Sequence, residues 1–314
     1  SEVVNPMLVK QTQGLNQSCG IVLIDFAGSA DGRTLIDNLI LSNQPKPVAM
    51  PLRFKEGKLK IAQLTDVHWT PGSEKSEKGN PETILKVLDM EKPDVVILTG
   101  DVVTSKPAKE GWKRIVEMME TVGVPFAVTM GNHDAENWSE DSIYNYLSKS
   151  RLFIGKKGPE ALSGTGNYIL PVYASDGTDK INALLYCMDS NDYTADAEKY
   201  GNYAWIDWGQ IAWYREQSRQ YTTKNNGNPL PALAFFHIGV PEFKHLQNRP
   251  DMYGHLGEGG GFPKINSGMF QSMIEMGDVM GVFVGHDHDN DYIAQEYGIA
   301  LAYGRVSGHD AYGD

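Results

Sequence analysis

Residues able to bind metal ions are concentrated in five short segments of this chain. The segments supply aspartates, an asparagine and five of the chain's 8 histidines, and they are Asp66-Val67-His68, Gly100-Asp101, Gly131-Asn132-His133-Asp134, His237 and Gly285-His286-Asp287-His288. Carboxylates carry negative charge and can bridge two cations, whereas imidazoles suit zinc, iron and manganese. The set therefore offers enough ligands for two adjacent metal ions, an arrangement well suited to attack on a phosphate ester.

The spacing within the segments supports paired ligands. Asp66 and His68 lie two residues apart, so on an extended backbone both side chains can point to the same side. His286 and His288 have the same spacing. Each segment alone has an ordinary alternative, because an Asp-x-His triplet arises by chance, Gly-Asp is common in turns, and a lone histidine is often a packed or surface residue. The prediction of a metal site therefore depends on the whole ordered set of segments.

Apolar runs that predict buried strands directly precede the five segments. These strands are expected at residues 59–64, 94–98, 126–129, 233–236 and 279–284. Helices are expected at residues 80–91, 107–122, from 139 onward, 208–221 and 267–277, with a further strand at 181–186 and a hairpin at 292–303. Ligands in open α/β sheets gather beyond the carboxyl ends of the strands. The alternation therefore predicts an α/β protein whose site is assembled by the fold, with Asp101 as the natural bridging carboxylate.

Residues 1–51 contain none of the ligand segments, and we predict an N-terminal extension and linker packed on a main domain at 52–314. Within the extension, residues 20–26 resemble a strand, and residues 34–41 a short helix or strand. Three prolines between positions 43 and 51 indicate a linker.

Composition is ordinary for a globular enzyme, with 41% hydrophobic and 22% charged residues among 314. The net charge of −12 argues against a general affinity for nucleic acid or anionic membranes. Two cysteines, Cys19 and Cys187, predict no disulfide framework, and Cys187 is expected to be a buried thiol. No stretch reaches the roughly 20 apolar residues of a membrane span. An intact signal peptide is not expected at Ser1, so both a secreted or periplasmic protein with its signal removed and a cytoplasmic one stay open.

In their order and spacing, the five segments resemble the signature of the calcineurin-like metallophosphoesterase family over roughly residues 52–305. The resemblance implies two stacked mixed β-sheets flanked by helices. It implies one metal held by Asp66, His68, Asp101 and His288, and a second held by Asp101, Asn132, His237 and His286. His133 is then expected to face the substrate and to protonate the leaving group, with Asp134 orienting it.

The segment from Pro51 to Trp69 is most similar to a branch related to purple acid phosphatases, yet two features depart from that branch. Thr104 stands where purple acid phosphatases carry a tyrosine ligand, and they lack the histidine that His68 supplies. The metal identity, among Mn, Zn, Fe and Mg, therefore stays open. A further departure follows Gly304-Arg305-Val306, where the family usually continues with a strand and this sequence has a polar tail, so either the sequence is trimmed or residues 20–26 supply that strand.

The preferred hypothesis is a phosphomonoesterase in which a hydroxide shared by two cations attacks phosphorus. Its substrate would be a small-molecule or protein phosphate ester, and nucleic acid is disfavoured. A phosphodiesterase acting on nucleotides or lipid headgroups is the first alternative, and a non-catalytic, metal-stabilised scaffold is the second. Tyr203 and Trp69 are candidates for lining the cleft or for the core, and residues 257–261 for a lid or a plain loop. The oligomeric state is undetermined.

Overall fold

The computed structural model describes residues 49–313, which lie within one compact unit, Val48–Asp314. The elements predicted at residues 20–26 and 34–41, most of the linker and Cys19 fall outside the described residues. The division into an extension at 1–51 and a main domain at 52–314 therefore stays a prediction. Within residues 49–313, no helix combines the length and the apolar character needed to cross a bilayer.

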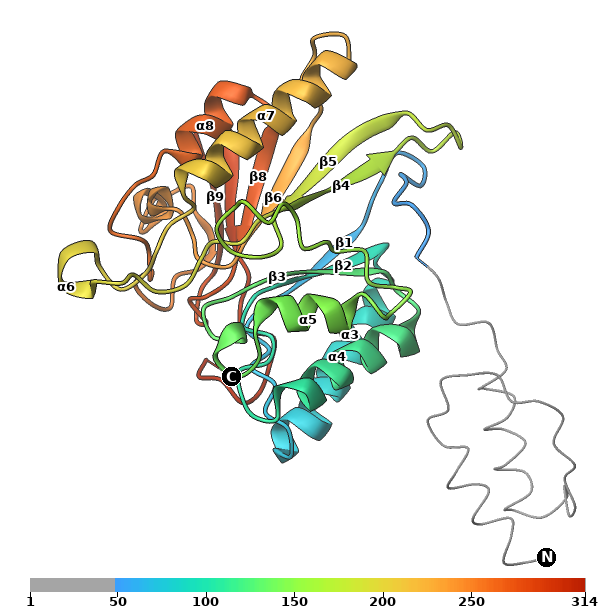
Figure 1. Ribbon diagram of the computed structural model, residues 1–314, viewed down its shortest axis with the longest axis vertical. Helices are drawn as coiled ribbons and strands as arrows, with labels where there is room; N and C mark the ends of the chain where they lie inside the picture. Colours follow the sequence, from blue (N-terminus) through green and yellow to red (C-terminus); the bar gives the residue numbers. More distant parts are fainter. Residues whose placement is uncertain (1–48, 314) are drawn as a thin grey trace, which may run out of the picture. The chain divides into compact units, whose positions relative to one another are not determined.

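The first sheet contains three parallel strands in the order β1 (Ile61–Leu64), β2 (Val95–Thr99) and β3 (Phe126–Thr129). Every residue of β2 is buried, as expected for a central parallel strand covered on both faces. Helices α3 (Asn80–Glu91), α4 (Ala108–Val122) and α5 (Glu140–Leu147) cover one face of this sheet (Figure 1). Two short turns join these elements, η1 (Lys75–Gly79) before α3 and η2 (Asp134–Glu136) before α5.

The second sheet has seven strands in the order β4-β5-β6-β8-β10-β9-β7. Their bounds are β4 (Tyr168–Tyr173), β5 (Ile181–Cys187), β6 (Ala232–Phe235), β7 (Tyr253–His255), β8 (Val279–Val284), β9 (Asp291–Glu296) and β10 (Ile299–Tyr303). The four strands β5, β6, β8 and β10 run parallel, whereas β4, β9 and β7 pair antiparallel with their neighbours. Helices α7 (Trp208–Lys224) and α8 (Met269–Met276) cover its outer face, and α6 (Ala197–Tyr200) and η3 (Pro241–Leu246) lie in connections (Figure 1).

The alternation of side chains along β5 shows how the layers are held together. Leu185 and Cys187 belong to the core shared with the first sheet, whereas Leu184 and Tyr186 belong to the core under α7 and α8. This period of two is what a strand buried on both faces requires. Cys187 is the buried thiol that was predicted, and burial raises its pKa to about 12.

The predicted fold class is confirmed: two sheets pack together and helices flank them. Over the described strands the first sheet is wholly parallel and only the second is mixed. The strands expected before the five ligand segments are all present, and the hairpin at 292–303 is β9 and β10. β4 and β7 were not predicted, because β4 contains Pro171 and β7 is only three residues long and exposed.

The carboxyl ends of strands from both sheets open onto one region. Gln63 joins the two sheets there, since its side-chain amide donates to Thr99 Oγ1 (2.9 Å) and to the carbonyl of Val284 (3.0 Å). Asp66, Asp101, Asn132, His237 and His286 all follow a strand end by two or three residues. Segments far apart in the sequence are thus brought together at one place.

A buried carboxylate beneath α7 offers a test of this packing. Tyr214 and Tyr186 donate to the two oxygens of Asp278 at 2.5 and 2.9 Å, and all three side chains are buried. Tyr214→Phe removes one donor from a buried charge, so we expect the free energy of unfolding to fall by about 1.5–3 kcal/mol. Urea denaturation measures this change. The matched control is Tyr253→Phe, at a tyrosine that is 81% exposed, and it should change stability by less than about 0.5 kcal/mol; equal effects of the two variants would contradict the assignment.

Candidate metal centre

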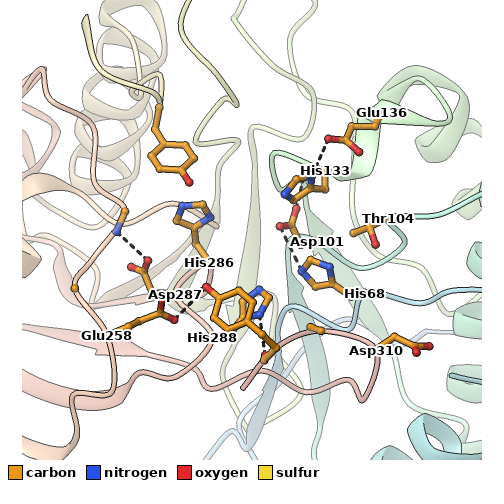
Figure 2. A pocket seen from close by; sticks show the side chains of 15 residues that line it. His68, Asp101, Thr104, His133, Glu136, Glu258, His286, Asp287, His288 and Asp310 are labelled. Carbon is orange, nitrogen blue, oxygen red and sulfur yellow. Dashed lines mark hydrogen bonds and ion pairs between the residues drawn. The ribbon is translucent and has the colours of Figure 1, made fainter. Parts of the chain in front are cut away.

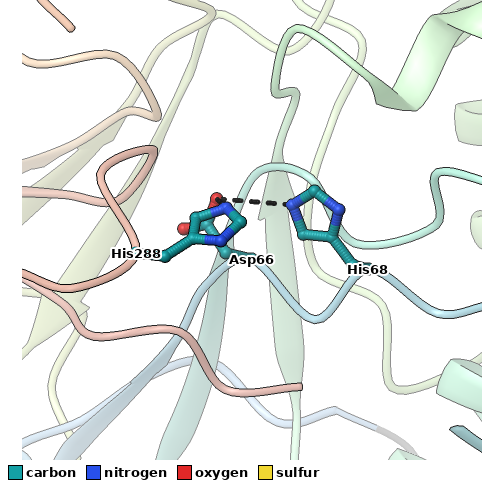
Figure 3. A group of neighbouring side chains, drawn as sticks. All are labelled: Asp66, His68 and His288. Carbon is teal, nitrogen blue, oxygen red and sulfur yellow. Dashed lines mark ion pairs between the residues drawn. The ribbon is translucent and has the colours of Figure 1, made fainter. Parts of the chain in front are cut away.

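The structure brings the predicted ligands into two neighbouring groups. Asp66, His68 and His288 form one (Figure 3), and Asp101, His237 and His286 form the other. Within each group the potential ligand atoms lie within 4.8 Å of one another. Asp101 lies toward both groups, because its Oδ2 is 3.7 Å from His68 Nε2 and 3.2 Å from His237 Nε2. This is the location that a bridging carboxylate needs.

Several buried atoms of these residues lack a hydrogen-bond partner, although buried polar atoms normally have one. They are Asp66 Oδ1, His68 Nε2, Asn132 Oδ1 and His237 Nε2. Asp66 Oδ1 lies 3.9 Å from His68 Nε2, 3.9 Å from His237 Nε2 and 3.3 Å from His288 Nε2. Ligand atoms bound at about 2.0–2.2 Å to one ion lie roughly 3–4 Å apart. The unpartnered atoms therefore fit a metal centre.

The protein holds the opposite atom of three of these ligands, Asp66, His237 and His288. Histidine Nδ1 atoms contact carbonyl oxygens, His237 that of Thr99 at 2.8 Å and His288 that of Tyr312 at 3.0 Å. With Nδ1 donating to these carbonyls, Nε2 is left as a lone-pair donor toward the centre. Asp66 Oδ2 likewise accepts the backbone N–H of His286 at 2.9 Å. Such outer contacts fix ligand orientation before any ion binds.

The backbone at the ligands is unusual. Asp66, His68, Asp101 and His286 have φ values of 52°, 44°, 48° and 78°, in a left-handed region that costs non-glycine residues of order 1–3 kcal/mol each. Gly100 shows why glycine precedes a ligand, because a Cβ there would lie 2.4 Å from His237 Nδ1. Strain of this kind persists where the surrounding structure enforces it, and it clusters at functional sites.

Electrostatics point the same way. Burial opposes ionisation of Asp66, yet the neighbouring imidazoles of His237, His288 and His68 hold its pKa well below the usual range. For His237, burial acts to lower the pKa, and the carboxylates of Asp101 and Asp66 outweigh it and raise the pKa. Two buried carboxylates thus require positive charge beside them, and a divalent cation would supply it.

His133 lies beside this centre, but the carboxylate beside its ring is not the predicted one. Asp134 is buried, and its carboxylate accepts the backbone N–H groups of Val102, Val103 and Gly131 at 2.9–3.1 Å. Glu136 Oε1 instead lies 2.7 Å from His133 Nδ1. The carboxylate in contact with the His133 ring is thus that of Glu136, and the orienting role expected of Asp134 stays a prediction. Asp134 ties together the loops that carry Asp101 and Asn132.

Tyrosines around the centre were not predicted from the sequence, apart from Tyr203 as a candidate. The hydroxyl of Tyr193 accepts from Asn132 Nδ2 at 2.9 Å and lies 3.4 Å from His133 Nε2. Its ring stacks on Tyr203 at 5.9 Å, and Tyr203 meets the edge of His286 at 4.4 Å. The bond to Asn132 Nδ2 turns Asn132 Oδ1 away from Tyr193, where it has no hydrogen-bond partner. Sequence signals could not find Tyr193, because it follows β5 in a polar loop without a motif.

The centre opens into a cleft of about 630 Å³ (Figure 2). His68, Asp101, His133, His286 and His288 line it, together with Thr104. Of the aromatic candidates, Tyr203 lines the cleft, whereas Trp69 is buried in the core. The 257–261 loop contributes Glu258, Gly259 and Gly261 to the wall, and the Gly261 N–H donates to Asp287 Oδ1 at 2.8 Å.

Comparison with known proteins agrees with this geometry. Residues 59–290 match the family described as calcineurin-like phosphoesterase. The chain belongs to this family. It is 31% identical over 293 residues to a protein of Arabidopsis thaliana named probable inactive purple acid phosphatase 29, covering 83% of this chain and 75% of that protein. It is 30% identical to the phosphatase DCR2 of Saccharomyces cerevisiae, covering 77% of this chain and 46% of that protein.

Among solved structures, a dimetal phosphatase from Danio rerio superposes with a TM-score of 0.51 at 12% identity, covering 79% of this chain and 88% of that one. At this identity the similarity concerns the fold alone. The family and the two side-chain groups together imply a site for two metal ions.

Bound metal should stabilise the fold, because an ion that binds only the native state adds about 4 kcal/mol at 1,000 times its Kd. We expect protein loaded with Mn²⁺ or Zn²⁺ to unfold at a higher temperature than chelated protein, as measured by calorimetry. Asp101→Asn should lose most of this difference, since the variant weakens both groups. An unchanged melting temperature on chelation, with metal analysis confirming removal, would contradict the assignment.

Proposed function

We propose that this chain is a metal-dependent phosphoester hydrolase that acts on phosphate monoesters. The observation that carries the proposal is the gathering of unpartnered, buried ligand atoms around His68 and Asp101, which line the same cleft as His133. A purely structural metal site needs the ligand atoms, and it has no use for a cleft with His133 in its wall. Membership in a phosphoesterase family supports the reaction class.

In this proposal one cation is held by Asp66, His68, Asp101 and His288, and the other by Asp101, Asn132, His237 and His286. Two bound cations would activate a water molecule and neutralise charge on the phosphate. Hydrolysis then joins a water oxygen to phosphorus and breaks the bond to the alcohol oxygen, which needs a proton.

In this proposal His133 delivers that proton. Glu136 contacts Nδ1, so the ring is oriented with Nε2 away from Glu136 and 3.4 Å from the hydroxyl of Tyr193. In the protonated ring, Nε2–H can donate to the leaving oxygen while the Glu136 carboxylate balances the positive charge. Tyr193 and Glu136 thus act as positioning residues, one on each side of the imidazole.

Two alternatives remain to be separated from this proposal. The preference for monoesters is supported by relatives named phosphatases, and the same groups also suit diesters. The name of the Arabidopsis relative includes the words probable inactive, which favours the alternative of a non-catalytic, metal-stabilised scaffold. Against it, this chain retains the complete ligand set, the unpartnered ligand atoms and the His133–Glu136 contact.

A screen separates these alternatives. Apo-protein is reconstituted with Mn²⁺, Zn²⁺, Fe or Mg²⁺, and its metal content is measured. The rate of hydrolysis of mono- and diesters is then measured from the phosphate or alcohol released. We expect monoesters to be hydrolysed. Turnover of diesters alone would show a phosphodiesterase in place of a phosphomonoesterase. Inactivity on both ester classes with two metals bound would establish a non-catalytic scaffold.

The assignment of His133 predicts a separation of metal binding from turnover. His133→Ala should keep both metals, because Asp101 Oδ1 accepts the backbone N–H of His133 and not its side chain (2.9 Å). Loss of a general acid costs about 10²–10⁴ in rate, and the loss should be largest for esters with poor leaving groups. Metal analysis and a leaving-group series measure the two effects, and an empty metal site in this variant would contradict the role.

Glu136 and Asp134 provide a matched pair of amide substitutions. Glu136→Gln should lower kcat and alter its pH profile while stability stays within about 0.5 kcal/mol, because the side chain is half-exposed. Asp134→Asn should instead destabilise the fold by about 1–3 kcal/mol, since it weakens the acceptor of three buried backbone N–H groups. Kinetics and urea denaturation check both, and the opposite pattern would restore Asp134 as the partner of His133.

A further inference from the structure

The cleft beside the candidate metal centre carries carboxylates that neither the metal groups nor His133 use. Glu258 comes from the 257–261 loop and Asp310 from the segment after β10, and both line the cleft (Figure 2). Among residues 49–313, no lysine or arginine lines it. Apart from histidines and the proposed cations, the charged side chains that line the described part of the cleft are therefore carboxylates.

Neutral groups hold these two carboxylates in place. Glu258 Oε1 accepts the N–H of Asp289 at 2.9 Å, and both its oxygens accept from the Tyr312 hydroxyl at 3.2 and 3.1 Å. Asp310 accepts from the hydroxyls of Ser73 (2.8 Å) and Ser76. Arg305, which follows β10, is instead held by Asp289: Nη1 lies 3.0 Å from the backbone carbonyl oxygen of Asp289 and Nη2 lies 3.3 Å from its Oδ1. In the described part of the chain, no ion pair compensates Glu258 or Asp310.

An aromatic ring completes this wall. Tyr312 stacks on His288 with ring centroids 4.0 Å apart and planes inclined by 20°, and it is 57% exposed. Its hydroxyl is fixed by Glu258, so ring and carboxylate are held as one unit. An aromatic face next to carboxylates is the environment that binds ammonium groups, including quaternary ones.

We propose that the wall formed by Glu258, Asp310 and Tyr312 selects phosphate monoesters of small cationic alcohols, such as amino alcohols and their quaternary ammonium forms. This inference rests on the proposed function: the metal centre binds the phosphate, and the wall attracts the positive charge at the other end of the substrate. Polyanions such as nucleoside triphosphates are repelled by the same wall. A cleft of about 630 Å³ matches the size of small-molecule sites.

Two esters of the same shape test the proposal. Phosphocholine and 3,3-dimethylbutyl phosphate differ in that a carbon replaces the charged nitrogen. With metal-loaded full-length protein, we expect kcat/KM to favour phosphocholine by about tenfold, which corresponds to ~1.4 kcal/mol. The preference should shrink at high salt, because the screening length falls from about 30 Å at 0.01 M to about 3 Å at 1 M.

Variants locate the source of the preference. In the double variant Glu258→Gln, Asp310→Asn, the ratio of the two kcat/KM values should fall toward one, since the amides keep an acceptor oxygen for the hydroxyl donors and lose the charge. The control variant is Glu216→Gln on α7, which removes a negative charge at a residue that does not line the cleft. It should leave the ratio at the wild-type value. Binding of the two corresponding phosphonates, measured by calorimetry, should show the same tenfold difference in Kd without turnover.

The outcomes separate this inference from the proposed function. Equal kcat/KM for the two esters, or an unchanged ratio in the double variant, overturns the inference and leaves a phosphatase. Hydrolysis of neither ester by protein that hydrolyses other monoesters also overturns the inference. Inactivity on every monoester, with two metals bound, overturns the proposed function instead, and a tenfold tighter cationic phosphonate would then still uphold the charge selection. Faster turnover of an arginine-rich phosphopeptide than of phosphocholine would overturn the assignment to small alcohols.

Discussion

The site depends on one electrostatic constraint, the burial of two carboxylates side by side. Asp66 and Asp101 are both almost completely shielded from solvent, and ionised groups are stable in such surroundings only with opposite charge beside them. The chain meets this need in part with imidazoles, whose Nε2 atoms lie 3.2–3.9 Å from the two carboxylates. It also leaves ligand atoms without partners. Both features are explained if cations complete the site.

The layered fold is what makes this constraint sustainable. Strands of both sheets end at the same region, and Gln63 bonds groups from both sheets there. The left-handed backbone at Asp66, His68, Asp101 and His286 is then held by two rigid sheets, where a free loop would relax it. The outer hydrogen bonds of His237 and His288 to carbonyl oxygens leave their Nε2 atoms facing the centre. Preorganisation of this kind costs stability locally, and the shared core between the sheets offsets it.

How far the sequence predicts the structure depends on the kind of residue. The ligands were predictable because each follows a strand end by two to four residues, and strand ends converge in this type of fold. The carboxylate that contacts the ring of His133 could not be predicted in this way. Asp134 is adjacent in sequence, but the turn at η2 directs its carboxylate to backbone N–H groups and brings Glu136 to the ring. Tyr193, Glu258 and Tyr312 reach the site from loops, whose paths in space leave no periodic signal in the sequence.

This difference suggests a division between chemistry and recognition. The residues assigned to metal binding come from strand ends, where geometry is fixed by sheet hydrogen bonds, whereas those facing the outer cleft come from loops. The segment after β10 illustrates the point: where the family pattern predicts a further strand, its residues contact the site instead, with Tyr312 stacked on His288 and Asp310 bound to Ser73. Changing such a loop alters the charge and shape presented to a substrate without moving a strand. The metal core can thus stay constant while the outer wall decides which phosphate ester fits.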